Sequence, residues 1–139
     1  MSTSSADFNA QIIEEFHANQ GRVGGIFEGA PLLLLHHTGA KSDKNRINPL
    51  GYHSDGGRYV VCAANGGAPR NPDWYYNLKA HPRITVEVGA QTFTVLAEEL
   101  NGTARAELWP TLVAQAPTVG EYQARTTRQI PVFLLTRQD

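Results

Sequence analysis

The sequence predicts an α+β fold, mainly β, in which six antiparallel strands form a small barrel with helices attached. Three observations predict this class. The chain has 139 residues, enough for one domain and too few for two ordinary ones. Its apolar fraction of 41% is sufficient for a buried core. Its short apolar runs lie between glycine- and proline-containing turns and do not alternate regularly with helices, which favours an antiparallel barrel over a doubly wound sheet.

The first thirty residues are expected to precede the barrel, which we place over residues 31–139. Apolar residues recur at helical spacing over residues 4–20 and predict a short amphipathic helix. The glycine-rich stretch 22–30 is expected to be a mobile lead-in without regular structure. The helix is the segment that we would expect to make any peripheral contact with a membrane.

Three extended segments begin the predicted barrel. The run 32–37, four leucines and two histidines, has the length of a strand that is buried on both faces, although periodicity alone does not exclude a helix. Further strands are predicted at 46–53 and, after a turn at 55–57, at 58–64, where Val and Tyr favour extended structure. Together these segments predict an antiparallel meander.

A loop then leads to a predicted helix. Asn71 and Pro72 supply a capping side chain followed by a proline at the first helical position. Trp74 and Leu78 are four residues apart and are expected to anchor this helix in the core. The helix is predicted to end near residue 81.

The second half of the chain predicts a hairpin and two further helices. Alternating apolar residues over 84–97 flank a two-residue turn at 89–90. Helical spacing continues over 103–116, where Pro110 is expected to interrupt the helix. A capping box over 118–121 predicts the start of another helix.

The last predicted strand covers residues 130–136 and completes the six. Because proline cannot donate a backbone hydrogen bond, Pro131 predicts that this strand lies at a sheet edge or begins there.

The charge and the cysteine content exclude several classes of function and of site. The chain has 12 Lys and Arg against 13 Asp and Glu, so no overall field attracts nucleic acid and any anion site must be local. The single cysteine, Cys62, excludes an intrachain disulfide and fits a reducing compartment. No signal peptide and no apolar run of roughly 18 residues is apparent. We therefore expect a cytoplasmic protein without a transmembrane segment.

Several familiar signatures are absent from the sequence. It has no Gly-x-Gly-x-x-Gly motif and no Walker loop. His36 and His37 are neighbours on a predicted strand, so their side chains point to opposite faces, cannot chelate one metal ion and are expected to serve packing. Cys62 lies in a predicted strand and is expected to be an inert buried residue. We therefore expect no metal site.

Two segments carry candidate chemistry. Residues 39–46 place three cations and a serine hydroxyl in one loop, which could bind phosphate or carboxylates; the alternative is a solvated hairpin tip. Residues 66–78 combine two glycines with a helix amino terminus, which suits a planar anionic ligand. The alternative for this second segment is an ordinary connection from strand to helix.

An ordered set of motifs resembles the deazaflavin-dependent nitroreductase family, a branch of the split-barrel flavin and deazaflavin oxidoreductases. The motifs are Gly39-Ala40-Lys41-Ser42 with Arg46, Asn48-Pro49-Leu50, Gly66-Gly67, Pro72-x-Trp74-x-x-Asn77-Leu78 and Ile130-Pro131-Val132. The resemblance begins near residue 31 and runs to the end of the chain. It implies a split β-barrel of the FMN-binding type and an enzyme that passes hydride from reduced coenzyme F420 to an electron-poor organic acceptor.

The resemblance also implies the site residues. The phosphate and the acidic tail of F420 would be held by Lys41, Ser42 and Arg46, with Lys44 as a weaker candidate. The deazaflavin ring would be lined by Pro49, Ala63, Ala64, Asn65, Gly66, Gly67, Pro72, Trp74 and Asn77. Tyr122 resembles a family tyrosine that faces the acceptor and is the candidate catalytic residue, as a donor of a hydrogen bond or proton. Its alternative is a half-buried packing role.

The acceptor and the cofactor leave alternatives. A quinone, an enone or activated alkene, and a nitro compound all fit as acceptors. Family members that reduce nitroimidazoles usually have a serine where this chain has Ala64, which disfavours the nitro compound. An FMN-dependent reductase on the same barrel and a non-catalytic deazaflavin carrier are the alternative functions.

Overall fold

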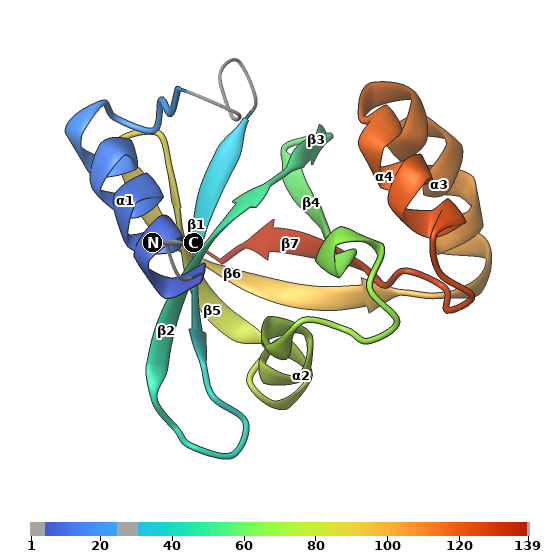
Figure 1. Ribbon diagram of the computed structural model, residues 1–139, viewed down its shortest axis with the longest axis horizontal. Coiled ribbons are helices and arrows are strands. Elements are labelled where there is room, and N and C mark those ends of the chain that lie inside the picture. The colour runs from blue at the N-terminus through green and yellow to red at the C-terminus, as the bar shows by residue number, and fades with distance from the viewer. Residues whose placement is uncertain (1–4, 25–30, 139) are drawn as a thin grey trace.

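The computed structural model describes residues 5–24 and 31–138. Figure 1 shows a curled antiparallel sheet with helices packed around it. The strands are β1 (Leu32–Thr38), β2 (Asn45–Gly51), β3 (His53–Asp55), β4 (Arg58–Cys62), β5 (Arg83–Val88), β6 (Gln91–Leu100) and β7 (Val132–Arg137). The helices are α1 (Ser5–Ala18), α2 (Asp73–Ala80), α3 (Gly102–Gln115) and α4 (Pro117–Ala124), with a short 3₁₀ turn η2 (Asn65–Gly67). The predicted mainly β, antiparallel fold is confirmed, with seven strands in these residues instead of six.

The predicted meander is wrong, because the chain after β1 changes partner near the end of the expected second strand. β2 pairs with β1, whereas β3 pairs with β4. The sheet order is β2-β1-β5-β6-β7-β4-β3, so β2 and β3 are the two edges of the sheet. Only Tyr52 separates these edges along the chain. The edges must therefore come close together, which curls the sheet into a half-barrel.

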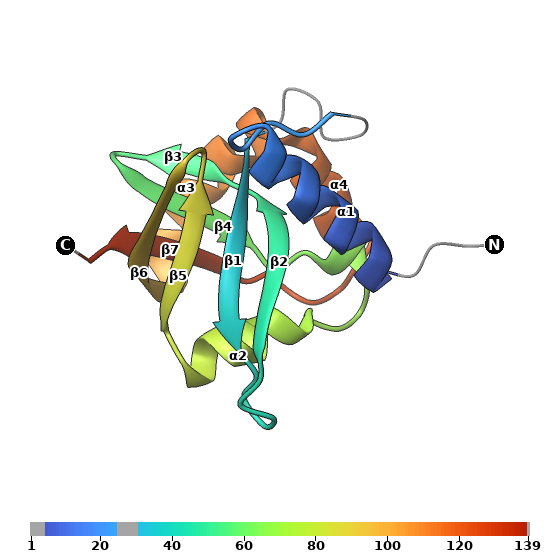
Figure 2. The same ribbon diagram turned by 90° about the vertical axis from the view of Figure 1, so that its left-hand side faces the viewer.

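The leucine run of β1 is buried on both faces, as predicted. Leu33 and Leu35 are fully buried in the core inside the curled sheet. Leu32 and Leu34 face the other way and pack with Phe16 of α1 in a second cluster. Figure 2 shows α1 lying along the outside of β1 and β2. This double burial explains why the run is uniformly apolar instead of alternating. Of the predicted lead-in 22–30, residues 25–30 lie outside the described residues.

α2 is anchored as the sequence predicts, but it begins differently. Trp74 and Leu78 are buried in the core beneath it. The cap position is Pro72, and no side chain caps the helix. Asn71, the predicted cap, instead accepts a hydrogen bond of 2.7 Å from the guanidinium of Arg128. A hydrogen bond from a charged donor is stronger than a neutral cap, which explains the difference.

α3 and α4 correct two further predictions. Pro110 lies inside α3 without ending it. A proline there costs about 3 kcal/mol, and the burial of Leu112 beyond it, in a cluster with β4 and β7, offsets that loss. The predicted capping box is also wrong, because α4 begins at Pro117 and Thr118 is already helical. Proline at the first position already has the helical φ, so the helix starts two residues earlier than a cap at Thr118 would allow.

The predicted hairpin of β5 and β6 around Gly89 and Ala90 is confirmed. β7 begins just after Pro131, so the prediction of a strand start is also confirmed. The strand lies between β6 and β4, so it is not an edge. The carbonyl of Pro131 still accepts a hydrogen bond of 2.9 Å from the N–H of Ala63. The missing N–H of the proline therefore falls outside the β7 ladder.

Candidate functional site

A turn rich in cations joins β1 to β2, and we call residues 39–44 the basic turn. The N–H of Gly39 donates to the carbonyl of Lys44 at 2.9 Å, and the N–H of Asp43 donates back to the carbonyl of Gly39 at 3.0 Å. A Cβ at position 39 would collide with the hydroxyl oxygen of Ser42. Only glycine therefore leaves room for the serine to fold over the turn and accept the N–H of Lys44 at 3.2 Å.

A hollow of about 490 Å³ lies between the basic turn and α2, and we call it the smaller hollow. It is lined by Gly39, Ala40, Lys41, Ser42, Arg46, Asp73, Tyr76 and Asn77. Within residues 5–24 and 31–138, neither Lys41 nor Arg46 forms an ion pair with a carboxylate. Asp73 is the one acidic side chain among the lining residues, and it is exposed. The smaller hollow is therefore suited to an anion.

A second hollow of about 800 Å³, the larger hollow, adjoins the first. Its lining comes from α1, β1, β2, β4, the segment before α2 and the first turn of α2. It consists of Asn9, Ala10, Ile13, His37, Arg46, Ile47, Asn48, Leu50, Cys62, Asn65, Arg70, Asn71, Pro72, Asp73 and Trp74. Arg46 and Asp73 line both hollows, so the two lie side by side. The larger hollow combines apolar side chains with several amides, a lining typical of sites for planar organic ligands.

A chain of hydrogen bonds passes through the wall between the hollows. The N–H of Ala40 donates to Oδ1 of Asn77 at 2.9 Å, and Nδ2 of Asn77 is 2.9 Å from Nδ1 of His37. Nε2 of His37 is 2.7 Å from Oδ1 of Asn48. His37 and Asn77 are 3% and 6% exposed, so water does not compete for these bonds. The chain links the basic turn to α2, β1 and β2.

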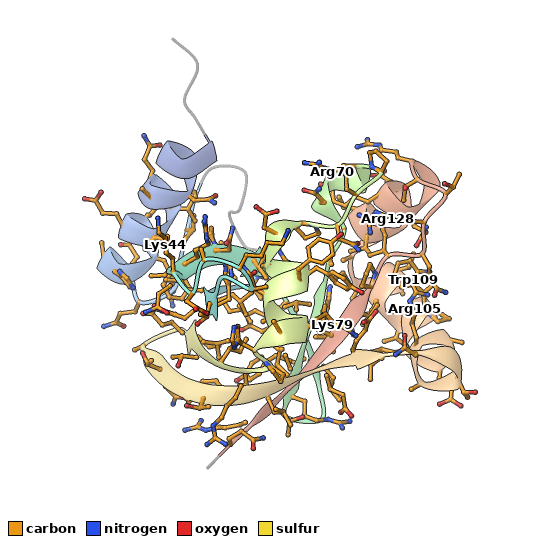
Figure 3. All side chains as sticks on the ribbon, turned by 90° about the horizontal axis from the view of Figure 1, so that it is seen from below. Lys44, Arg70, Lys79, Arg105, Trp109 and Arg128 are labelled. Carbon is orange, nitrogen blue, oxygen red and sulfur yellow. The ribbon has the colours of Figure 1, made fainter. Side chains whose placement is uncertain are left out.

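Residues 63–71, which we call the glycine loop, are held by one arginine from the far end of the chain. The guanidinium of Arg128 donates to the carbonyl oxygens of Ala63 (3.2 Å), Ala64 (2.8 Å) and Ala68 (3.0 Å), besides the side chain of Asn71. Figure 3 shows Arg128 beside α4 and the glycine loop. These bonds use the planar fork of the guanidinium, which a lysine could not imitate.

The second glycine of the pair makes a close approach to α4. Gly67 has φ +83°, and a Cβ there would lie 3.0 Å from both the carbonyl oxygen of Tyr122 and Cβ of Arg125. The backbone of Gly67 is therefore approached closely by the protein's own helix. Tyr122 is half-buried, and its ring lies 5.6 Å from the guanidinium of Arg125.

The structure brings together about half of the predicted site residues. Those that line one or both hollows are Lys41, Ser42, Arg46, Asn65, Pro72, Trp74 and Asn77. Ala63, Ala64 and Gly67 support the glycine loop from within, and Gly66 belongs to η2. Lys44 is exposed on the basic turn and Pro49 lies within β2. Tyr122 lines neither hollow, and its catalytic role stays a prediction.

Sequence reasoning misses several residues of the site. It assigns His37 to packing and gives Arg128 no role, yet the first lies between the hollows and the second holds the glycine loop. The sequence does offer one signal for His37: its hydrogen-bond partner Asn48 belongs to one of the family motifs. α1 also contributes Ala10 and Ile13 to the larger hollow. No local pattern in the sequence marks His37 or Arg128, because their partners are distant in the sequence.

The cysteine in the larger hollow is not poised for chemistry. Burial raises the pKa of Cys62 to about 11, although the nearby Arg105 guanidinium lowers it in part. The thiol is therefore protonated at neutral pH and a poor nucleophile. In the described part of the chain, no group of three His, Cys, Asp or Glu side chains is arranged to hold a metal ion. Likewise, none of the described helices has the length and hydropathy needed to cross a bilayer.

Comparisons with known proteins agree on one family. Residues 10–137 match the family model described as F420H(2)-dependent quinone reductase. An F420H(2)-dependent quinone reductase of Mycobacterium tuberculosis is 42% identical over 127 residues, which cover 88% of this chain and 85% of the relative. A solved structure described as an F420-H2 dependent reductase is 40% identical, with a TM-score of 0.69 over 76% of this chain and 93% of that chain.

Two further structures extend the comparison. One, described as a domain-swapped dimer, is 36% identical with a TM-score of 0.71, and covers 95% of this chain and 99% of that chain. A heme-binding protein from Mycobacterium smegmatis is only 15% identical with a TM-score of 0.60, so it shares the fold alone.

Proposed function

Since this chain belongs to the F420H(2)-dependent quinone reductase family, we propose that its two adjoining hollows seat reduced coenzyme F420 together with the quinone. The enzyme is an oxidoreductase that transfers hydride from F420H2 to a quinone. The predicted family, enzyme class and cofactor are thereby confirmed. The placement of the cofactor is our proposal, and the observation that carries it is the position of Arg46, which lines both hollows.

The donor set of the smaller hollow fits the acidic part of F420. Lys41 and Arg46 offer positive charge that no carboxylate of the described residues neutralises, and Ser42 offers a hydroxyl. The guanidinium fork of Arg46 can pair with two oxygens of a phosphate or carboxylate at once. In a chain of formal net charge -1, this local excess of cations is what an anionic ligand would require.

The larger hollow fits a flat ring and a quinone side by side. Trp74, Ile47 and Leu50 provide apolar surface, and Asn48 and Asn65 provide amides that can orient ring carbonyls. When bound there, reduced F420 supplies the hydride. The protein holds the reacting molecules close together and keeps water away from them, an orientation effect worth several kcal/mol. Amide N–H groups at this position would also stabilise negative charge on the quinone oxygen.

The proposal is tested by removing the cations of the smaller hollow. Replacing both Lys41 and Arg46 by alanine is expected to weaken F420 binding by about tenfold to hundredfold, because charge-assisted hydrogen bonds are lost. The loss should shrink as salt is raised, since salt already screens the parent site. The measurement is a fluorescence titration with F420 at low and high salt, with FMN as the competing cofactor.

Two variants serve as controls for this titration. Arg83→Ala removes an exposed cation at the start of β5, and Lys44→Ala removes an exposed cation of the basic turn that lines neither hollow. Both should bind F420 like the parent. Equal affinity in the parent and in the Lys41 and Arg46 double variant would exclude the smaller hollow as the anion site. Tighter binding of FMN than of F420 would contradict the proposed ligand.

A further inference from the structure

The hydrogen-bond chain between the two hollows permits only one protonation state. The N–H of Ala40 can only donate, so Asn77 must present its carbonyl oxygen to it. The NH2 group of Asn77 then faces Nδ1 of His37, which must be unprotonated in order to accept. The proton of the neutral ring therefore resides on Nε2, where the carbonyl oxygen of Asn48 accepts it. Each donor in the chain meets one acceptor.

A second proton on His37 cannot be accommodated by a simple rotation. It would place an N–H at Nδ1 directly against the NH2 group of Asn77, donor against donor. Turning the Asn77 amide over would bring its carbonyl to the ring, but would then set its NH2 group against the N–H of Ala40. Because His37 and Asn77 are buried, neither conflict can be relieved by exchange with solvent. Protonation must therefore break one link of the chain.

Resting on the proposed function, we propose that His37 is a positioning residue for cofactor binding. In its neutral form it holds Asn77, and through Asn77 the backbone of Ala40, so that the basic turn keeps Lys41 and Ser42 facing the smaller hollow. Protonation of His37 releases the basic turn and so weakens the binding of the acidic part of F420. Cofactor binding is in this way coupled to a proton at a buried histidine that does not itself touch the anion site.

The surroundings of His37 favour the neutral form at neutral pH. Burial lowers its pKa below the ordinary value of 6.5, and Arg46 on β2 and His36 on β1 lower it further, while the hydrogen bond to Asn48 and the charge of Asp73 on α2 oppose this. The net direction is downward, so release of the turn requires acid below pH 6.5. At the turn itself, His81 is 3.9 Å from Asp43, but both are exposed, so this pair contributes little.

The proposal is tested by measuring F420 affinity from about pH 5 to about pH 8 in three proteins. His37→Asn places a carbonyl oxygen near the position of Nδ1, so it can still accept from Asn77, but it cannot be protonated. Relative to the parent, this variant should bind F420 more tightly at the acid end, by a factor that grows as the pH falls, and similarly at pH 8. Taking the ratio at each pH removes any titration of the cofactor itself. His53→Asn, a histidine outside both hollows, should show the pH profile of the parent.

A second measurement does not depend on the cofactor or on the variant folding. In cofactor-free parent protein, nitrogen NMR should show His37 with its proton on Nε2, and the amide of Ala40 should shift with the same midpoint as the His37 ring. The positioning role would be overturned if F420 affinity had the same pH dependence in the parent and in His37→Asn. It would also be overturned if the Ala40 amide signal did not shift when the His37 ring titrates. Absence of F420 binding by the parent at every pH would instead overturn the proposed function, and with it the ligand named here.

Discussion

At the scale of single residues, the site depends on side chains that satisfy several partners at once. Arg128 donates to three carbonyl oxygens of the glycine loop and to Asn71, and it is only half-buried. Asn77 uses both ends of its amide, one toward the basic turn and one toward His37. Such residues are sensitive to conservative replacement, because a substitute must match the geometry as well as the charge.

Arg128→Lys provides the test at this scale. Lysine keeps the charge, but its single ammonium group cannot contact all the acceptors of Arg128 at once, so some of the carbonyl oxygens lose their hydrogen-bond partner. We expect the free energy of unfolding to fall by about 1–3 kcal/mol, measured by urea denaturation. Arg125→Lys, at an exposed position in the same segment, is the control and should change stability by less than about 0.5 kcal/mol. Equal stability of both variants would show that the fork is not needed.

At the scale of elements, the glycine loop and α4 are fitted against each other. Gly67 has a positive φ and also lies against the backbone of Tyr122. Gly57, in the turn between β3 and β4, has nearly the same φ of +85°, but a Cβ added there would meet no atom within 4 Å. A substitution at Gly57 therefore measures the free-energy cost of the backbone conformation alone. A substitution at Gly67 measures that cost together with the cost of the close approach to α4.

Alanine substitution at each glycine measures that difference. Gly57→Ala is expected to lose about 1 kcal/mol of unfolding free energy, since alanine disfavours positive φ. Gly67→Ala should lose more, by about 1–2 kcal/mol, because α4 must shift to admit the Cβ. Thermal unfolding of both variants provides the measurement. If the two losses are equal, the contact between the glycine loop and α4 is loose enough to absorb a methyl group.

At the scale of the whole molecule, α1 is held to the outside of the half-barrel by its apolar face and by one carboxylate. Glu87 on β5 lies 2.8 Å from Nε2 of His17 on α1 and 2.6 Å from Nε2 of His36 on β1. Burial raises the pKa of Glu87, but the hydrogen bonds from the two histidines outweigh this effect and leave it below its ordinary value. Because α1 also lines the larger hollow, its docking bears on the site.

The pH dependence of this contact follows from the sign of the shift. A carboxyl group whose pKa is lowered by folding stabilises the protein above its ordinary pKa of 4.5, and the contribution is lost as pH falls through the lowered value. Glu87→Gln is therefore expected to cost about 1 kcal/mol at pH 7 and less near pH 3. Urea denaturation at both pH values checks this, with Glu98→Gln, an exposed position on β6, as the control. A cost that does not change with pH would mean that the charge of Glu87 is not involved.

Local patterns in the sequence determined much of the fold. The leucine run of β1, the alternation of β5 and β6 and the spacing of Trp74 and Leu78 each reflect burial of neighbouring residues, so they can be read without knowing the partners. The basic turn was readable for the same reason, because Lys41, Ser42 and Arg46 are close in the sequence. The family and its cofactor followed from the order of such local motifs.

Only the tertiary structure decided how these pieces meet. The break at Tyr52, which sends β2 and β3 to opposite edges of the sheet, depends on which strands are free to pair. The position of Arg46 in the lining of both hollows depends on that pairing. Arg128 and His37 acquire their roles from partners 57 to 65 and 11 to 40 residues away. A hydrogen bond requires specific distances and directions, and no periodicity in the chain records them.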